Sequence, residues 1–261
     1  MPDALHVAKT GLNAQQQRMS VITNNLANVN TVGFKRDRAN FETLLYQNYR
    51  DAGTQTSQNS NSPTGLAIGT GVRIVSTEKL YTQGNIINTE NSLDITIDGP
   101  GFFQVMTPGS QIAYTRAGNF TKNAEGNIVT SSGYPLEPAI KIPTNATSVS
   151  ISKDGIVNVT VPGATKPENV GTIELATFAN FSGLKPIGES FVLATASSGD
   201  PITGAPGTNS TGKLIQGSLE SSNVNVVEEL VGMIETQRSY EVNSKAIAAV
   251  DGMQKYLTNN T

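Results

Sequence analysis

The sequence contains no cysteine and no tryptophan, and its single histidine is His6. Without cysteine the chain has no disulfide, no thiolate nucleophile and no thiolate metal ligand. One histidine cannot make a histidine-based metal cluster or a catalytic triad, and His6 is expected to be solvated or interfacial. We therefore expect a protein that is not an enzyme and that holds no cofactor and no metal. The lack of cysteine fits a cytoplasmic chain and equally one secreted without folding catalysts.

Apolar residues are also sparse, at 37% of 261 residues with 6% aromatic, which is little for one dense core. The longest apolar runs span a few residues, such as 246–250, so none is expected to cross a bilayer. A net charge of −3 provides no basic field for nucleic acid or an anionic membrane. The first nine residues lack a basic stretch followed by an apolar one, so no Sec-type signal peptide is expected.

Both ends of the chain carry apolar residues at alternating spacings of three and four. This spacing places side chains along one seam of a helix, as in a coiled coil. Helices are expected over about residues 2–29 and from about residue 223 onward. A second stripe on the C-terminal helix indicates more than one neighbour. The predicted assembly interface comprises Leu5, Leu12, Met19, Ile22, Leu26, Val29, Val226, Leu230, Met233, Ile234, Tyr240, Ile247, Val250 and Met253.

The same spacing also occurs in an ordinary amphipathic helix that packs on its own domain, and this alternative stays open for either helix alone. Two such helices, one at each end, favour assembly. Charge agrees weakly, because residues 1–50 carry six bases and three acids whereas residues 220–261 carry three bases and six acids. Opposite charges favour pairing of the two ends, although each exposed ion pair adds little.

Three residue types mark the expected helix ends. Gly33 suits a left-handed C-cap after the first helix. Asn223 suits an N-cap for the last helix, and Glu228 and Glu229 would lie in its first turns, where the helix dipole favours acids.

The centre of the chain predicts β-structure, because apolar and polar residues alternate with period two. Asp154-Gly155 is a hairpin turn signal, and residues 41–46 predict a short helix or an extended segment. Residues 51–63 are polar and would be disordered alone, so they form a linker or an arm that orders against a partner. Strands are expected near residues 93–97, 102–105, 114, 128–129, 149–151, 156–161, 173–177 and 191–194.

The predicted fold class is α+β, with long N- and C-terminal helices pairing as a coiled coil and a central all-β domain joined by extended segments. The helical core domain would be discontinuous and take residues 1–33 and 222–261. Residues 34–70 and 197–221 would connect it to a β-rich outer domain at residues 71–196. The polar arm 51–63 lies within the first connection.

Three patterns could carry chemistry, and each has a simpler interpretation. Asp94 and Asp98 could be paired carboxylates, but Asp98 lies in a Gly-Pro turn, where Asp commonly makes local hydrogen bonds. The glycines of residues 65–71 match a phosphate loop weakly and predict a flexible hinge. The basic cluster at residues 35–38 lacks interleaved aromatics, so it predicts a solvated face or an intersubunit contact rather than nucleic-acid binding.

Three segments together resemble a known family. Residues 22–31 (ITNNLANVNT) with 33–35 (GFK), and residues 222–230 (SNVNVVEEL), resemble the N- and C-terminal signatures of the bacterial flagellar rod and hook family. Residues 93–103, with GPGFF at their end, are similar to the turn that opens the family's β-domain. All three in this order are highly specific. The signature residues are Asn24, Asn25, Leu26, Ala27, Asn28, Gly33, Phe34, Asn223, Asn225 and Glu229.

The resemblance implies a structural subunit of the flagellar basal-body distal rod, because the length and the segment 51–63 are similar to distal-rod members. Such a subunit would assemble into a rigid hollow drive shaft that transmits motor torque to the hook and lines the export channel. Its helices would form the inner layer and its β-domain the outer layer. A proximal-rod or hook relative is the nearest alternative, and a secreted β-domain that binds or hydrolyses cell-wall carbohydrate is the alternative from another class.

The implied partners are other copies of the chain in a helical tubular polymer, the proximal rod proteins and the hook protein. The peptidoglycan and outer-membrane ring proteins, the rod cap and the flagellar export apparatus are also implied, and nucleic acid is not. The implied location is the basal body from the periplasm to the outer membrane, reached by type III export without a cleaved signal peptide.

Overall fold

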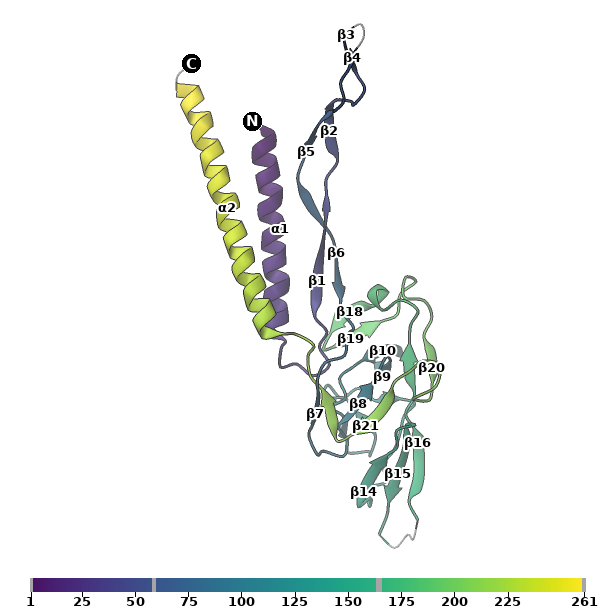
Figure 1. The fold of residues 1–261 in the computed structure, drawn as a ribbon. Coiled ribbons are helices and arrows are strands. Elements are labelled where there is room, and N and C mark those ends of the chain that lie inside the picture. Colours follow the sequence, from purple (N-terminus) through teal and green to yellow (C-terminus); the bar gives the residue numbers. More distant parts are fainter. Residues whose placement is uncertain (1, 58–59, 163–165, 260–261) are drawn as a thin grey trace. The chain divides into compact units, whose positions relative to one another are not determined.

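The computed structural model describes residues 2–57, 60–162 and 166–259, and the chain divides into two compact units (Figure 1). The helical unit comprises Met1–Ala27, Asp37–Glu78 and Asn225–Thr261. The β-unit comprises Asn28–Arg36 and Lys79–Val224. Two terminal helices and a β-rich centre confirm the α+β prediction. Each unit is built from segments that are distant in the sequence, so neither can be excised by one cut in the chain.

The helical unit contains two long helices, α1 (Pro2–Ala27) and α2 (Val226–Asn259), which pack against each other. They are antiparallel, because the end of α1 meets the start of α2 and earlier residues of α1 meet later residues of α2. The residue pairs that show this are Asn25 with Glu229, Ile22 with Gly232, Arg18 with Glu235, and Gly11 with Asn243.

The N-cap of α2 is Asn225, two residues beyond the predicted Asn223. The Asn225 Oδ1 accepts hydrogen bonds from the backbone N–H of Val227 at 3.1 Å and of Glu228 at 3.5 Å. These are the free amides that an N-cap satisfies. Asn223 is unavailable for capping because its side-chain amide is bonded to other backbone segments of the β-unit.

Helix α1 ends at Ala27, so the prediction that it reaches Val29 and ends with Gly33 as a C-cap is wrong. Residues 28–34 form turns instead, in which Thr31 N–H donates to Asn28 O and Phe34 N–H donates to Thr31 O. Gly33 does have the left-handed φ of +67° expected of a C-cap glycine. Its role is a close approach, because a Cβ there would lie 2.6 Å from the backbone nitrogen of Ala117.

The rest of the helical unit is a long two-stranded hairpin, in which the chain runs out and back between residues 37 and 79 (Figure 1). The paired segments are β1 (Asp37–Thr43) with β6 (Val72–Lys79), β2 (Tyr46–Arg50) with β5 (Leu66–Gly69), and β3 (Gln55–Ser57) with β4 (Ser60–Asn61). The segment 41–46 is therefore extended rather than helical. The polar segment 51–63 forms the far part of the hairpin, and its residues 58 and 59 lie outside the described residues.

Sequence alone does not reveal this hairpin as strands, because both of its faces are exposed over much of its length. All five residues of β2 and all four of β5 are exposed. Alternation of apolar and polar residues arises only where one face of a strand is buried. Backbone pairing and a few exposed side-chain bonds, such as the Arg73–Glu42 ion pair, hold this hairpin together, and neither leaves an alternating apolar pattern in the sequence.

The β-unit is centred on one antiparallel sheet with strand order β18-β19-β10-β9-β17-β20, to which β13 adds beside β9. The bounds of its strands are β9 (Phe102–Thr107), β10 (Gln111–Thr115), β13 (Leu136–Glu137), β17 (Leu175–Thr177), β18 (Lys185–Gly188), β19 (Phe191–Leu193) and β20 (Ile202–Gly204). A short 3₁₀ helix at Phe181–Gly183 precedes β18.

Smaller sheets complete the β-unit. One has the order β14 (Ser148–Ile151), β15 (Ile156–Thr160) and β16 (Glu168–Thr172), and its first turn is at Asp154-Gly155 as predicted. The two-stranded sheets are β7 (Ile86–Asn88) with β22 (Ser218–Glu220), β8 (Ile95–Asp98) with β21 (Lys213–Gln216), and β11 (Thr121–Lys122) with β12 (Ile128–Val129). The strands expected near residues 93–97 through 191–194 all have counterparts in this unit.

The observed boundaries differ from the predicted partition at several places. Residues 28–33, expected in the helical core, lie in the β-unit, and residues 72–78, expected in the β-rich domain, pair with β1 in the helical unit. Residues 202–220, expected as a connection, add β20, β21 and β22 to the β-unit. These late strands are short, and they pair with strands more than a hundred residues earlier or with β17, so their local sequence carries little signal.

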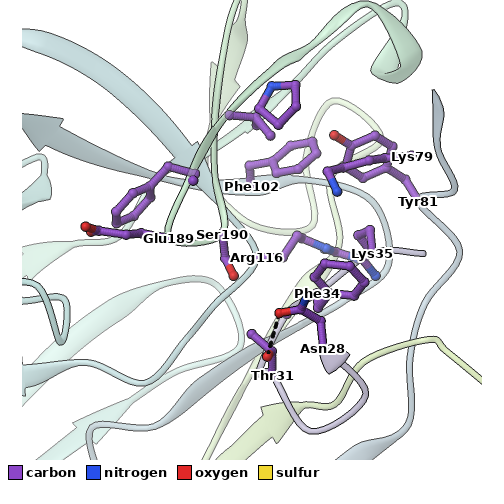
Figure 2. Close-up of a pocket in the computed structure, with 15 residues that line it drawn as sticks. Asn28, Thr31, Phe34, Lys35, Lys79, Tyr81, Phe102, Arg116, Glu189 and Ser190 are labelled. Carbon is purple, nitrogen blue, oxygen red and sulfur yellow. Dashed lines mark hydrogen bonds between the residues drawn. The ribbon is translucent and has the colours of Figure 1, made fainter. Parts of the chain in front are cut away.

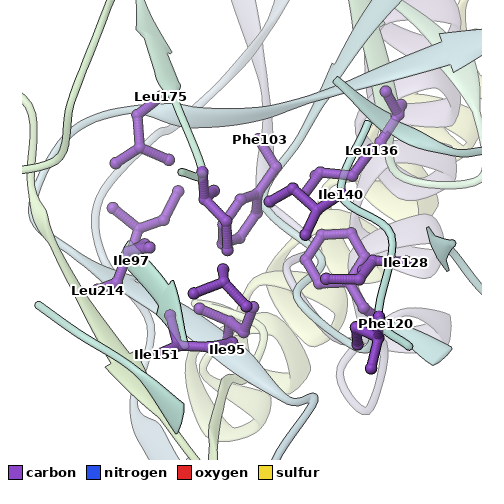
Figure 3. Packing of buried hydrophobic residues seen from close by; sticks show 14 of the residues in the cluster. Ile95, Ile97, Phe103, Phe120, Ile128, Leu136, Ile140, Ile151, Leu175 and Leu214 are labelled. Atoms are coloured by element: carbon purple, nitrogen blue, oxygen red, sulfur yellow. The ribbon is translucent and has the colours of Figure 1, made fainter. Parts of the chain in front are cut away.

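Two neighbouring phenylalanines on β9 show how the core is divided. Successive side chains of a strand point to opposite faces of the sheet, so Phe103 enters one hydrophobic cluster and Phe102 another. Phe103 is fully buried and meets Phe120 edge to face at 5.1 Å between ring centroids, in the cluster shown in Figure 3. Phe102 packs against Phe178 and Tyr81. Both faces of the central sheet are therefore covered.

Phe103→Ala should lower the free energy of unfolding of the β-unit by about 3–5 kcal/mol, because it removes a fully buried ring and leaves a cavity. Ile112→Ala on the neighbouring strand β10 is the control, since Ile112 is 38% exposed and should cost less than about 1.5 kcal/mol. Urea unfolding followed by tyrosine fluorescence measures both. Equal midpoints for the two variants would show that Phe103 is not central to the core.

Candidate assembly site

The face that α1 and α2 present to each other is made of small and polar side chains. Ala14 on α1 and Thr236 on α2 are buried, and Ile22 packs on Gly232, where a Cβ would lie 3.5 Å from the Ile22 Cδ1. Gly11 lies similarly close to Asn243. Such small groups let two helix backbones approach closely.

The opposite face of α2 carries large apolar side chains that are exposed. At about 100° per residue these side chains lie on the side of the helix away from Gly232 and Thr236. They are between 50 and 71% exposed, far from the burial that their size favours. The exposed apolar face comprises Val227, Val231, Ile234, Val242 and Tyr256.

The residues of the predicted assembly interface are distributed over both faces and their flanks. Ile22 is buried, and Val29 lies beyond α1 in the β-unit, where it is half-buried. Those that are half-buried on the helices are Leu12, Met19, Leu26, Met233, Ile247 and Val250. Those more than a third exposed are Leu5, Val226, Leu230, Ile234, Tyr240 and Met253. The structure does not bring these exposed residues together with a partner inside the described chain.

The sequence prediction included Ile22 but missed the small and polar residues that pair the helices, because it searched for large apolar side chains. The available signal is the seven-residue spacing of Glu229, Thr236 and Asn243 on α2, which is repeated by Asn25, Arg18 and Gly11 on α1. A seven-residue repeat keeps a set of residues on one helix face over many turns.

Asn25 joins three parts of the helical unit. Its side-chain Nδ2 donates to the backbone oxygen of Asp37 at 2.9 Å, and its Oδ1 accepts from the Asp37 N–H at 2.8 Å. The same Nδ2 donates to Glu229 Oε1 at 3.3 Å. Asn25 and Glu229 are almost fully buried, at 1% and 2% exposed. The amide thus pairs with the first residue of β1 as a neighbouring strand would, while it also fixes the first turn of α2.

A cluster of buried charged side chains lies in the β-unit, next to the signature residues Gly33 and Phe34. Lys35 Nζ is 2.6 Å from Glu220 Oε1, and Arg116 Nε is 3.3 Å from Glu220 Oε2. The three side chains are 3, 6 and 1% exposed for Lys35, Arg116 and Glu220. Glu220 Oε1 also accepts a hydrogen bond from the Gly84 N–H at 2.9 Å.

Two buried cations share one carboxylate in this cluster, and backbone oxygens supply the remaining acceptors. Lys35 Nζ donates to Thr82 O at 2.7 Å, and Arg116 Nη1 donates to Gly99 O at 2.8 Å and Gly101 O at 2.9 Å. Burial lowers the pKa of Lys35, and the charge of Arg116 lowers it further, while Glu220 opposes both effects. Burial likewise lowers the pKa of Arg116. The cluster is structural, because each charged group is enclosed and bonded.

The Asn223 side-chain amide also bridges separate backbone segments, in this case within the β-unit. Its Oδ1 accepts from the Arg36 N–H at 2.7 Å, and its Nδ2 donates to Leu80 O at 2.8 Å and Thr82 O at 3.1 Å. Gly33 N–H donates to Glu220 O at 2.9 Å nearby. The signature residues Gly33 and Asn223 therefore lie where the segments 28–36, 79–84 and 220–223 meet.

A cleft of about 280 Å³ lies beside this cluster and is lined by Asn28, Thr31, Phe34, Lys35 and eleven further residues of the β-unit (Figure 2). Its walls include the rings of Phe34, Tyr81 and Phe102, and Lys79 Nζ lies 4.9 Å from the centre of the Phe34 ring. The basic cluster at residues 35–38 is thus split: Lys35 is buried, whereas Arg38 is exposed and paired with Glu78. Its prediction as one solvated face is wrong for Lys35.

Asp94 and Asp98 do not form a carboxylate pair. They stand at opposite ends of β8, which at about 3.4 Å per residue separates them by roughly 13 Å. Asp94 is buried and accepts hydrogen bonds from Thr89 Oγ1 and Asn91 Nδ2, which is a structural role in a turn. Within the described part of the chain, no group of three or more His, Cys, Asp or Glu could hold a metal ion. No helix in that part has the length and apolarity needed to span a membrane.

Comparison with known proteins matches each of these regions to flagellar families. The family described as flagella basal body rod protein matches residues 5–35, and the flagellar hook protein FlgE/F/G D1 domain matches residues 96–159. The C-terminal family of the flagellar basal body rod FlgEFG proteins matches residues 215–260. Asn25 and Lys35 lie within the N-terminal match, and Glu220 and Asn223 lie within the C-terminal match.

Full-length relatives agree. The flagellar basal-body rod protein FlgG of Buchnera aphidicola subsp. Schizaphis graminum is 54% identical over 258 residues, which cover 99% of both chains. FlgG of Caulobacter vibrioides is 47% identical over 96% of both chains. FlgF of the same organism is 33% identical over 94% of this chain and 92% of its own.

A protein with paired terminal helices, a β-rich centre and these matches at both ends is a flagellar axial protein. The chain belongs to the flagellar rod and hook family, and its full-length relatives place it among the basal-body rod proteins. This assignment replaces the alternative of a secreted carbohydrate-binding domain.

Glu220→Gln should destabilise the β-unit by about 3–5 kcal/mol, because it leaves the buried cations Lys35 and Arg116 without their counter-charge. Glu42→Gln is the matched control, since Glu42 pairs with Arg73 in an ion pair whose side chains are both more than half exposed. An exposed pair of this kind is worth at most about 1 kcal/mol. Urea unfolding of the full chain compares the two, and a Glu220→Gln variant as stable as Glu42→Gln contradicts the structural role of the cluster.

Proposed function

We propose that the chain is a structural subunit of the flagellar distal rod, which polymerises into a rigid hollow shaft between the motor and the hook. The observation that carries this proposal is the pair of unlike faces on α2. One face packs on α1 with mainly small and polar residues of α2, while the other exposes five large apolar side chains. The two helices of such a subunit pair within one chain, and burial of the exposed face still requires neighbouring subunits.

Burial of the exposed apolar face would favour assembly. Full burial of one large apolar side chain yields roughly 1.5–3 kcal/mol, so five partly exposed ones supply at most on the order of 10 kcal/mol before ordering and association costs. Neighbouring subunits in a tube would bury this face between adjacent helix pairs. The α1–α2 pairs would then form an inner coiled-coil layer around the export channel, with the β-unit in the outer layer.

The distal rod is favoured over the proximal rod by the comparison within one organism. Against proteins of Caulobacter vibrioides, the chain is 47% identical to FlgG and 33% identical to FlgF. The partners of a distal-rod subunit would be further copies of itself, the proximal rod and hook proteins, the rod cap, the export apparatus and the ring proteins of the peptidoglycan and outer membrane. Its location would run from the periplasm to the outer membrane, after export as an unfolded chain.

The hairpin would extend from each helix pair and wedge between neighbouring subunits. Its outer part exposes Leu45, Tyr46, Tyr49, Leu66 and Ile68, which is more apolar surface than a free hairpin requires. The residues 36–95 that contain it fall outside the three family matches, which cover the segments at either side. The hairpin is therefore a candidate for the feature that distinguishes a straight rod from related flagellar structures.

Ile234→Asp should abolish rod growth while the subunit stays folded, because it places a charge in the exposed apolar face of α2. The matched control is Ile202→Asp in the β-unit, since both isoleucines are 52% exposed. Electron microscopy of basal bodies scores rod formation, and circular dichroism checks folding. Normal rods with Ile234→Asp would remove this face from the assembly interface.

Deletion of residues 51–63 should convert the straight rod into a bendable structure, because the far part of the hairpin no longer reaches a neighbour. A variant in which Gly/Ser residues replace these thirteen positions separates loss of length from loss of sequence. Rod curvature in electron micrographs is the measurement. Straight rods after the deletion would exclude the wedge.

A further inference from the structure

The glycine-rich residues 65–71 form part of a hydrogen-bonded hairpin in the structure rather than the predicted flexible hinge. They comprise β5 and the two residues that precede β6. Leu44 N–H donates to Gly71 O at 2.9 Å, and Thr70 Oγ1 donates to Leu45 O at 2.7 Å. The hairpin is therefore closed by hydrogen bonds at the place where the β1–β6 pairing gives way to the β2–β5 pairing.

At this place the hairpin contacts helix α1 through Thr10. The backbone N–H of Val72 donates to Thr10 Oγ1 at 3.3 Å, and the same hydroxyl donates to Val7 O at 2.7 Å within the helix. A hydroxyl can donate one hydrogen bond and accept others, so Thr10 serves the helix and the hairpin at once.

Gly71 makes the close approach possible. Its φ is +121°, and a Cβ built there would lie 2.2 Å from Thr10 Oγ1, closer than any real contact. Around it, the facing residues of α1 and the hairpin are small, with Ala8 and Gly11 on the helix and Gly69 on the strand. No side chain separates the hairpin backbone from the helix at this point.

The hairpin needs such a support. An isolated two-stranded hairpin is at best marginally stable in water, and every residue of β2 and β5 is exposed. The β2–β5 part of the hairpin therefore has no hydrophobic core of its own.

We propose that Thr10 and Gly71 form a positioning contact that seats the hairpin on α1, so that the hairpin and the helix pair move as one body. Neither residue is among the signature residues. The consequence for the polymer rests on the proposed function: a load that a neighbour places on the hairpin passes to the helix pair at this contact, and the rod is stiff because of it.

The test uses the full chain with one spin label on α1 at Gln17 and one on β2 at Tyr49, introduced as cysteines into a chain that has none. Gly71→Ala should abolish the narrow distance distribution, because the new Cβ collides with the Thr10 hydroxyl. Gly53→Ala is the control, since Gly53 also has a left-handed φ, of +87°, but nothing lies within 4 Å of its Cβ position. It should leave the distribution narrow.

Second variants at Thr10 make the test specific. Thr10→Ala should broaden the distribution, because it removes the hydroxyl that accepts from the Val72 N–H. Thr10→Ser should leave the distribution narrow, because serine keeps the hydroxyl. If Gly71→Ala resembles Gly53→Ala, or if Thr10→Ala gives the same narrow distribution as Thr10→Ser, the contact does not position the hairpin.

Electron micrographs of rods from the same variants test the consequence. Gly71→Ala should give rods that bend, whereas Gly53→Ala and Thr10→Ser should give straight ones. Straight rods from Gly71→Ala overturn the link to stiffness even where the distances change. If the unsubstituted chain formed no rods, the proposed function would fail, and the distances in the free chain would still decide the contact.

Discussion

The β-unit depends on one buried carboxylate, that of Glu220. It lies between two buried cations, and transfer of any of these charges out of water is costly unless each is paired and hydrogen-bonded. Lys35, Arg116 and the backbone at residues 82–84 and 99–101 must all be in place for that pairing to exist. Segments from both ends of the sequence are therefore held in one arrangement, which an apolar contact of the same size would specify less strictly.

Two asparagine side chains hold further backbone segments together at places where no β-sheet connects them. Asn25 and Asn223 each donate from Nδ2 and accept at Oδ1, and their partners are backbone groups. A side-chain amide is the group that can satisfy a backbone N–H and a backbone oxygen together, whereas an aspartate can only accept when ionised. This requirement explains asparagine at these positions more directly than a surface role, since Asn25 is almost fully buried.

How much the sequence predicts depends on whether burial imposes a pattern. The strand near residues 156–161 has one buried face, the strand near residues 93–97 alternates apolar and polar residues, and both are predictable from the sequence, as are the terminal helices from their three-four spacing. The hairpin has two exposed faces and left no pattern. The ion cluster joins Lys35 to Glu220 across 185 residues, and no local signal connects them. The N-cap was misplaced by two residues because Asn223 and Asn225 look alike in sequence and only their partners differ.

The helix pairing itself follows from a division of residues between two faces of α2. If the large apolar side chains packed on α1, the pair would be stable alone and would have little reason to bind neighbours. The pairing face carries Glu229, Thr236 and Asn243 at seven-residue spacing instead, and polar groups at such positions specify register at a cost in stability. Large apolar side chains such as Val227, Val231 and Ile234 remain exposed on the opposite face. In the proposed rod subunit, register would be set within one chain, and burial of these side chains would come from neighbouring subunits.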